Sequence, residues 1–155
     1  MTIDVDISLG ELTDRAAITD VLHTYARVVD ERDFAAVAAV FTEDCLAEYG
    51  LRPGDTLHSA AAVVDWLTTQ LADSTATSHH ISNVQIAFTD ADHAEATSYV
   101  YAWHRPPGAP ADPVILGRYV DRVVRTAAGW RIAHRRMLGH GVVGFPDGLV
   151  RPLPR

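Results

Sequence analysis

Hydrophobic residues recur every three or four positions along three stretches in the first half of the chain. This spacing predicts helices, because it gathers the apolar side chains on one helical face. Ser8 and Glu11 have the spacing of a capping box, and the pattern that follows predicts a helix over residues 11–30. Asp33 is a suitable N-cap for a short second helix, and a third helix is predicted over residues 59–72.

The hydrophobic period changes to two from His79 onward, where Val84, Ile86 and Phe88 alternate with polar residues. Alternation of this kind is typical of a strand with one buried face. Further strands, separated by turns and a proline-containing loop, are predicted over residues 94–104, 114–125 and 130–138. Because helices precede strands, we expect an α+β architecture in which helices cover a concave face of an antiparallel sheet.

The length and the charge fit one globular domain. The chain of 155 residues can enclose a single core, and we divide it into an N-terminal extension (1–10), a domain (11–140) and a C-terminal tail (141–155). With 13 basic and 20 acidic side chains, the formal net charge is -7. Since the arginines are scattered among acids, binding to nucleic acid or to an anionic membrane is not expected.

Several classes of chemistry are absent from the sequence. Cys45 is the only cysteine, which excludes an intramolecular disulfide and a CxxC motif. The histidines and carboxylates lack tight metal-ligand spacing, so no metal is expected. No apolar run reaches the roughly 18 residues of a spanning helix, and residues 1–10 contain no basic region of a signal peptide. We therefore expect a cytoplasmic protein that uses acid–base chemistry by His, Asp and Tyr.

Five short motifs follow one another in an order that carries a family resemblance. They read YARVVDERDF (25–34), VFTED (40–44), HHISN (79–83), GRYVDR (117–122) and GWRIAHRR (129–136). Together they resemble SnoaL-like domains of the nuclear transport factor 2-like superfamily. The resemblance implies a cone-shaped α+β barrel, in which N-terminal helices pack on a strongly curved, mainly antiparallel sheet around a deep pocket.

Within this superfamily, the chain is most similar in residue type to the scytalone dehydratase and bile-acid dehydratase branch, whose members need no cofactor. The resemblance implies that the catalytic residues include Tyr25, Asp30, Tyr49 and His79. His104 falls where scytalone dehydratase has a second pocket histidine. Ordinary roles stay open, because tyrosines are frequent in cores, Asp30 ends a helix, and His104 precedes a loop.

Strand alternation sends His79 and His80 to opposite faces of the sheet, so only one of them enters a pocket. The apolar residues that follow share parity with His80, whereas the spacing to Asn83 matches His79 to the family histidine. A β-bulge near the start of the strand would reconcile the two patterns. We predict that His79 faces the pocket.

Other side chains are candidates for binding a substrate. Asp121 has two open roles, as a pocket acid or as the partner in a surface salt bridge. Arg136 shares the parity of Ile132 and His134, and it is a candidate for binding a substrate carboxylate. The remaining candidates for contacts with the substrate are Trp66, Asn83 and Trp103.

These residues predict a hydro-lyase, a dehydratase acting on a small, largely apolar substrate that carries a carbonyl group. His79, oriented by Asp30, would remove a proton next to the carbonyl, while His104 would supply a proton to the departing hydroxide. Tyr25 and Tyr49 would hydrogen-bond the carbonyl oxygen. The alternatives are a polyketide cyclase or steroid-type isomerase on the same fold, and a non-catalytic binding or assembly module. The resemblance also implies a homodimer or homotrimer formed through the outer face of the sheet.

Overall fold

The structure is a computed structural model that describes residues 7–108, 110–145 and 148–153. Within these ranges the helical elements are α1 (Leu9–Asp30), α2 (Phe34–Val37), η1 (Ala38–Val40), η2 (Pro53–Asp55) and α3 (Ala60–Gln70), where η denotes a 3-10 turn. The strands are β1 (Phe41–Glu48), β2 (Thr56–Leu57), β3 (Ala76–Phe88), β4 (His93–Arg105), β5 (Val114–Thr126), β6 (Gly129–Val143) and β7 (Arg151–Pro152).

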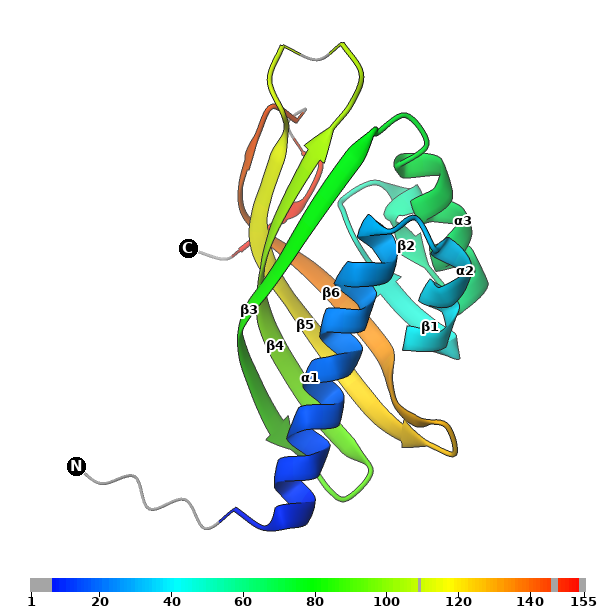
Figure 1. Cartoon of the computed structure of the whole chain (residues 1–155), viewed down its shortest axis with the longest axis vertical. Helices are drawn as coiled ribbons and strands as arrows, with labels where there is room; N and C mark the ends of the chain where they lie inside the picture. Colours follow the sequence, from blue (N-terminus) through cyan, green and yellow to red (C-terminus); the bar gives the residue numbers. More distant parts are fainter. Residues whose placement is uncertain (1–6, 109, 146–147, 154–155) are drawn as a thin grey trace, which may run out of the picture.

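The seven described strands belong to one sheet, in the order β2-β1-β6-β5-β4-β3, and β7 also pairs with β6. β1 and β7 run parallel to β6, and the other neighbours are antiparallel. The sheet is curved, and α1 runs along one face of it, with α2 and α3 beside α1 (Figure 1). The predicted α+β cone is confirmed, although β2 and β3 remain free ends and the sheet does not close into a barrel.

Side-chain caps set the starts of the three helices. Ser8 caps α1, which begins at Leu9, two residues earlier than predicted. Asp33 and Ser59 cap α2 and α3 by accepting a hydrogen bond from the backbone three residues further on. The second helix is short, as predicted, because Phe41 is already the first residue of β1. None of the helices that the structure describes is long and apolar enough to cross a membrane.

A β-bulge in β3 changes which side chains face the helices. Asn83 and Val84 together oppose a single residue of β4, Ser98. Asn83 has a φ of 50°, in the left-handed region that asparagine tolerates better than most residues. The extra residue shifts the alternation by one, so His79 before the bulge and Val84 after it both face inward. The predicted bulge is present, but it lies in the middle of the strand.

A second bulge, in β6, leaves Ala133 without a partner on β5. Before this bulge the buried residue is Ile132, whereas after it the buried residues include Arg135 and Met137. The extra residue thus moves the inward face from even to odd positions. Arg136, which an uninterrupted alternation places inside, is turned outward.

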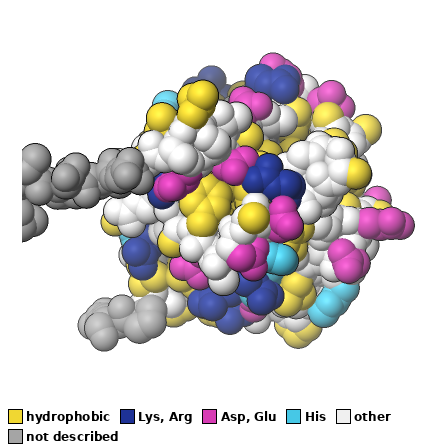
Figure 2. All heavy atoms as spheres, turned by 90° about the horizontal axis from the view of Figure 1, so that it is seen from below, with side chains coloured by type: hydrophobic (Ala, Val, Ile, Leu, Met, Phe, Trp, Pro, Cys, Tyr) yellow, Lys and Arg dark blue, Asp and Glu magenta, His cyan; other side chains and the backbone are white. Residues whose placement is uncertain are grey.

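The two ends of the cone differ in how they are filled. At the end where α1 begins, the rings of Phe88 and Trp130 pack with centroids 6.0 Å apart. Asp14 covers them by accepting hydrogen bonds from Trp130 Nε1 and from Arg125. Figure 2 views this end and shows side chains of both charges around hydrophobic ones. Toward the β4–β5 loop the side chains leave a cavity.

Residues 149–152, which follow β6 in the chain, return to the sheet at β7 and form part of the cavity wall. Val150 packs so closely on Gly139 that a Cβ atom there would lie 2.4 Å from its Cγ2, so only glycine fits. Arg151 binds Glu48 with an N–O distance of 2.8 Å. Leu149 and Val150 line the cavity. This part of the predicted tail is therefore packed against the domain.

Candidate active site

A cavity of about 330 Å³ lies between the helices and the wide end of the sheet. Cavities of this size are typical of sites for small organic ligands. Most of the lining side chains are apolar or aromatic. Among the residues predicted from the sequence, those that line the cavity are Tyr25, Tyr49, Trp66, His79 and His104.

Asp30 and His79 form a hydrogen-bonded pair beside the cavity. Asp30 Oδ1 lies 2.7 Å from His79 Nδ1, and Asp30 Oδ2 accepts the backbone N–H of His79 at 2.8 Å. The Thr77 hydroxyl donates to Asp30 Oδ1 at 2.9 Å. Because Nδ1 faces the carboxylate, Nε2 is the ring nitrogen left for a ligand. Asp30 is not among the cavity-lining residues, so it acts on a ligand only through His79.

The environment of Asp30 favours its charged form. Burial alone would raise the pKa of Asp30, but hydrogen bonds from the side chain and backbone of His79 outweigh burial and lower this pKa below its ordinary value. Asp30 is also the last residue of α1, where an acid opposes the helix dipole. An ionised carboxylate at this place stabilises a protonated His79 ring.

His104 lies next to His79, with ring centroids 5.6 Å apart. Its Nδ1 is buried and has no hydrogen-bond partner among the described residues. Burial, followed by the charge of His79, lowers the pKa of His104 to about 4. The ring is therefore neutral at pH 7, and it offers one N–H as a hydrogen-bond donor. A neutral ring is better suited to donating a hydrogen bond than to the expected transfer of a proton to a departing hydroxide.

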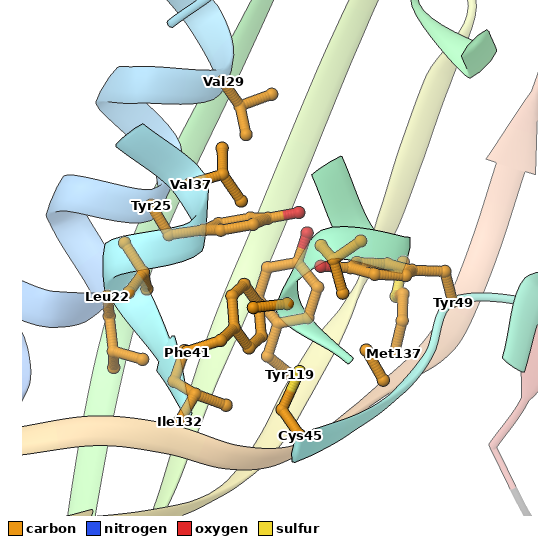
Figure 3. Packing of buried hydrophobic residues seen from close by; sticks show 14 of the residues in the cluster. Leu22, Tyr25, Val29, Val37, Phe41, Cys45, Tyr49, Tyr119, Ile132 and Met137 are labelled. Carbon is orange, nitrogen blue, oxygen red and sulfur yellow. The ribbon is translucent and has the colours of Figure 1, made fainter. Parts of the chain in front are cut away.

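Three tyrosine hydroxyls point toward one another within the fold (Figure 3). Tyr25 comes from α1, Tyr49 follows β1, and Tyr119 comes from β5, and all three line the cavity. Burial raises the pKa of each phenol above its ordinary value, so the hydroxyls stay protonated. The Tyr49 hydroxyl has no hydrogen-bond partner among the described residues. The cluster can therefore donate hydrogen bonds to a ligand oxygen.

A buried ion pair supports this tyrosine cluster. Arg135 donates from Nε and Nη2 to the two oxygens of Asp121, at 2.9 and 2.7 Å, and both side chains are 0% exposed. The Arg135 guanidinium carbon lies 4.2 Å from the ring centre of Tyr25 and 4.0 Å from that of Tyr119, within cation–π range. Burial opposes the charge, but Asp121 outweighs it and holds the pKa of Arg135 well above its ordinary value.

Tyr49 and Trp66 form a flat aromatic wall. Their rings are stacked, with centroids 4.7 Å apart and planes at 12°. Asp55 fixes this wall, because its Oδ1 accepts Trp66 Nε1–H at 3.3 Å and its backbone oxygen accepts Tyr49 N–H at 2.9 Å. A flat wall in an apolar cavity suits a planar ligand.

Two predicted substrate-binding residues on β3 and β4 lie outside the cavity. Trp103 is on the outer face of β4, against Arg105, because its buried neighbours Ala102 and His104 occupy the inner face. Asn83 is exposed, because it is the extra residue of the bulge in β3. Neither side chain therefore reaches a ligand in the cavity.

The two predicted residues on β5 and β6 are also corrected. Asp121 is buried, but it binds Arg135 and does not line the cavity. Arg136 has a side chain that is 43% exposed and lies 4.0 Å from Glu48. The bulge at Ala133 explains the second correction, because it brings Arg135 inward in place of Arg136.

Three residues of the site were not predicted. Tyr119 shares the strand face of Asp121, so its alternation alone could have identified it. Arg135 was hidden by the bulge in β6, which leaves no clear sequence signal. Asp55 lies in η2 between two strands, where no hydrophobic period applies.

Other kinds of chemistry would need a metal-binding group of side chains or a carboxylate base in the cavity. Within the described ranges, no three His, Cys, Asp or Glu side chains are grouped so that they could hold a metal ion. Glu48, the acid next to Tyr49, binds His134 at 2.9 Å and Arg151 at 2.8 Å. Glu48 does not line the cavity.

The fold and the site define a class of small α+β cones with an internal cavity that contains a His–Asp pair and tyrosine hydroxyls. Comparison with known families agrees with the predicted resemblance: the SnoaL-like domain matches residues 10–136, and the chain belongs to this family.

Individual relatives are similar over most of their length. An uncharacterized protein of Mycobacterium tuberculosis, Rv2910c, is 28% identical over 131 residues, which are 83% of this chain and 87% of that protein. A protein from Novosphingobium aromaticivorans, provisionally named scytalone dehydratase, has a structure with a TM-score of 0.87 at 27% identity, over 94% of this chain and 97% of the other. The hexachlorocyclohexane dehydrochlorinase LinA-type3 of Novosphingobium barchaimii has the same fold, with a TM-score of 0.78 at 17% identity, over 95% and 99% of the two chains.

Proposed function

We propose that the protein is a hydro-lyase that removes water from a small, planar substrate with a carbonyl group. The observation that carries the proposal is the 2.7 Å contact between Asp30 and His79, beside a cavity that is lined by His79 and by three protonated tyrosines. A His–Asp pair is suited to proton abstraction, and the tyrosines are suited to binding the oxygen on which charge develops.

In the proposed reaction, His79 Nε2 takes a proton from the carbon next to the carbonyl. The electrons move toward the carbonyl oxygen, where the hydroxyls of Tyr25, Tyr49 and Tyr119 donate hydrogen bonds. The carbon–oxygen bond to the leaving hydroxyl then breaks, and the carbon–carbon double bond forms. The protonated His79, stabilised by Asp30, gives its proton to the leaving oxygen, which departs as water. His104 donates a hydrogen bond to this oxygen as a neutral ring.

The names of two similar structures support an elimination, since a dehydratase removes water and a dehydrochlorinase removes hydrogen chloride. Both reactions can begin with removal of a proton from carbon. Glu48 cannot serve as the base of the steroid-type isomerase alternative, because it is held by His134 and Arg151 outside the cavity, so this alternative would also need His79 as its base. The contact of Asp30 with His79 beside a cavity favours an enzyme over a binding or assembly module.

The first step can be tested with a simple planar ketone. 2-Indanone in D₂O exchanges the protons next to its carbonyl, and proton NMR measures the rate. The unaltered protein is expected to accelerate this exchange, and His79→Ala to reduce the acceleration by about 10²–10⁴-fold. Tyr49→Phe is expected to reduce it by about tenfold, because one donor to the oxygen is lost.

His80→Ala is the matched control. This neighbouring histidine is exposed and lies near Ser78, with 3.0 Å between Nε2 and the serine oxygen. Its loss is expected to leave the exchange rate unchanged. Equal exchange rates in His79→Ala and the unaltered protein would refute the assignment of His79 as the base.

A further inference from the structure

Asp55 is a buried acid that the proposed reaction does not use. The residue is 7% exposed and lines the cavity. Its Oδ1 accepts Trp66 Nε1–H at 3.3 Å, and its Oδ2 accepts the backbone N–H of Arg52 at 3.2 Å. Both donors are uncharged. None of the ion pairs formed within the described ranges includes Asp55.

Other sheltered carboxylates of the protein have stronger partners. Asp121 lies 2.7 Å from a guanidinium nitrogen of Arg135, and Glu48 lies 2.8 Å from one of Arg151. The contacts of Asp55 are long for hydrogen bonds to oxygen, and a carboxylate offers about four acceptor positions. A buried ion without a partner of opposite charge costs free energy. Within the described ranges, the carboxylate of Asp55 has no such partner. Acceptor positions also remain for a ligand.

The charges around the cavity indicate what kind of ligand group fits. The charged residues in the lining are Arg52, Asp55 and Asp73, and the Asp121–Arg135 pair lies behind the tyrosines. Asp30 adds a further negative charge behind His79. Acids therefore outnumber arginines, which disfavours a substrate carboxylate. The group that fits Asp55 is therefore a hydrogen-bond donor and not a second carboxylate.

We propose that Asp55 is a substrate-binding residue that accepts a hydrogen bond from a hydroxyl group of the substrate. This hydroxyl is distinct from the one that leaves, and the planar substrate lies against the Tyr49–Trp66 wall. This inference rests on the proposed function, from which it takes the planar ketone. It adds a second polar group of the substrate, the hydroxyl that binds to Asp55. The bonds to Trp66 and Arg52 hold the carboxylate in one orientation, so a hydroxyl binds to an acceptor that is already positioned.

Binding of three ketones to the unaltered protein tests this selectivity directly. 2-Indanone, 5-hydroxy-2-indanone and 5-methoxy-2-indanone share a planar ring system, and only the second has a hydroxyl to donate. Isothermal titration calorimetry is expected to show that the hydroxy compound binds about tenfold more tightly than the other two. Equal affinities for the hydroxy and methoxy compounds would overturn the proposal without the need for any variant.

Two carboxylate variants then locate the preference. Asp55→Asn keeps the shape but removes the charge, and it is expected to reduce the preference for the hydroxy compound to less than about threefold. Asp73→Asn is the matched control, because Asp73 also lines the cavity but is exposed; it is expected to keep the tenfold preference. A preference that survives in Asp55→Leu, which has a similar shape but no acceptor oxygen, assigns the hydroxyl to another residue and overturns the proposal.

His79→Ala separates this inference from the proposed function. The variant is expected to keep the binding preference while it loses proton exchange. If the unaltered protein fails to accelerate exchange but prefers the hydroxy compound, the hydro-lyase assignment fails and the role of Asp55 stands. If exchange is accelerated without the preference, Asp55 is not a substrate-binding residue.

Discussion

The site contains two carboxylates with basic partners, and they differ in burial and in the partner that each has. The Asp121–Arg135 pair is 0% exposed and bidentate, whereas the side chains of Asp30 and His79 are 25% and 7% exposed and share one contact between side chains. Arginine keeps its charge at all ordinary pH values, but histidine gains and loses a proton near neutrality. The first pair therefore fixes a charge in the fold, and the second can move a proton.

The two pairs therefore have different roles at the same cavity. The fixed charge of Arg135 lies against the rings of Tyr25 and Tyr119, where it supports the groups that bind a ligand oxygen. The titratable ring of His79 lies in the lining itself. A structural ion pair and a reactive pair can thus be distinguished by the basic partner and by access to the cavity.

The largest expected effect on stability comes from breaking the fixed pair. Asp121→Ala leaves the Arg135 guanidinium buried without a counter-ion, and we expect it to lower the free energy of unfolding by about 3–5 kcal/mol. Urea denaturation followed by circular dichroism measures this change. The double variant Asp121→Leu with Arg135→Met removes both charges, and it is expected to be clearly more stable than Asp121→Ala. If both proteins are equally unstable, lost packing and not an unpaired charge is the cause.

A smaller effect is expected when the other pair is titrated. The pKa of Asp30 in the folded protein lies below its ordinary value, which is about 3.9 in an unfolded chain. The stabilisation is therefore complete above the unfolded value, and it is lost as the pH falls through the lowered folded value. Urea denaturation of the unaltered protein and Asp30→Asn, from pH 7 down to the acid range, is expected to show a smaller loss in the variant. Parallel curves would contradict this contribution.

The smallest effect concerns the bulge that directs His79 inward. Asn83 has a φ of 50°, and a β-branched side chain is strained in this conformation. We expect Asn83→Val to lower the free energy of unfolding by about 1–2 kcal/mol, and Asn83→Gly to leave it nearly unchanged. Thermal denaturation of the two variants measures the difference. Equal stability of the valine and glycine variants would show that the backbone relaxes out of the left-handed region.

The elements of the fold could be predicted from the sequence wherever the spacing of hydrophobic residues stayed regular. The caps at Ser8 and Asp33, the helical spacing over residues 59–72 and the alternation along β4 predicted elements that the structure contains. Tyr25, Tyr49, His79 and His104 were predicted from the family resemblance and Trp66 as a further candidate for substrate contacts, and all five line the cavity. Such positions depend on local patterns and on motif order, which a single sequence records.

The predictions for Asn83 and Arg136 failed where a bulge interrupts the period. An unpaired residue is a property of two strands together, because it depends on the register of the neighbour. Neither of the two roles left open for Asp121 was a buried ion pair, because its partner Arg135 turns inward only through the bulge in β6. Asp55 was missed because a short 3-10 turn has no repeating hydrophobic pattern. These features depend on contacts between distant segments, which alternation within one strand does not report.

The unpaired Ala133 also bears on how members of such a fold can diverge. Deletion of Ala133 would remove the bulge and leave Ile132 and Arg135 facing inward, because the remaining residues would then alternate without interruption. In a related chain that lacks the extra residue, the equivalent of Arg135 therefore follows the equivalent of Ile132 by two positions instead of three. An alignment has to place a gap at Ala133 to compare inward residues with inward residues, so gap placement in β6 decides which arginine is counted as equivalent.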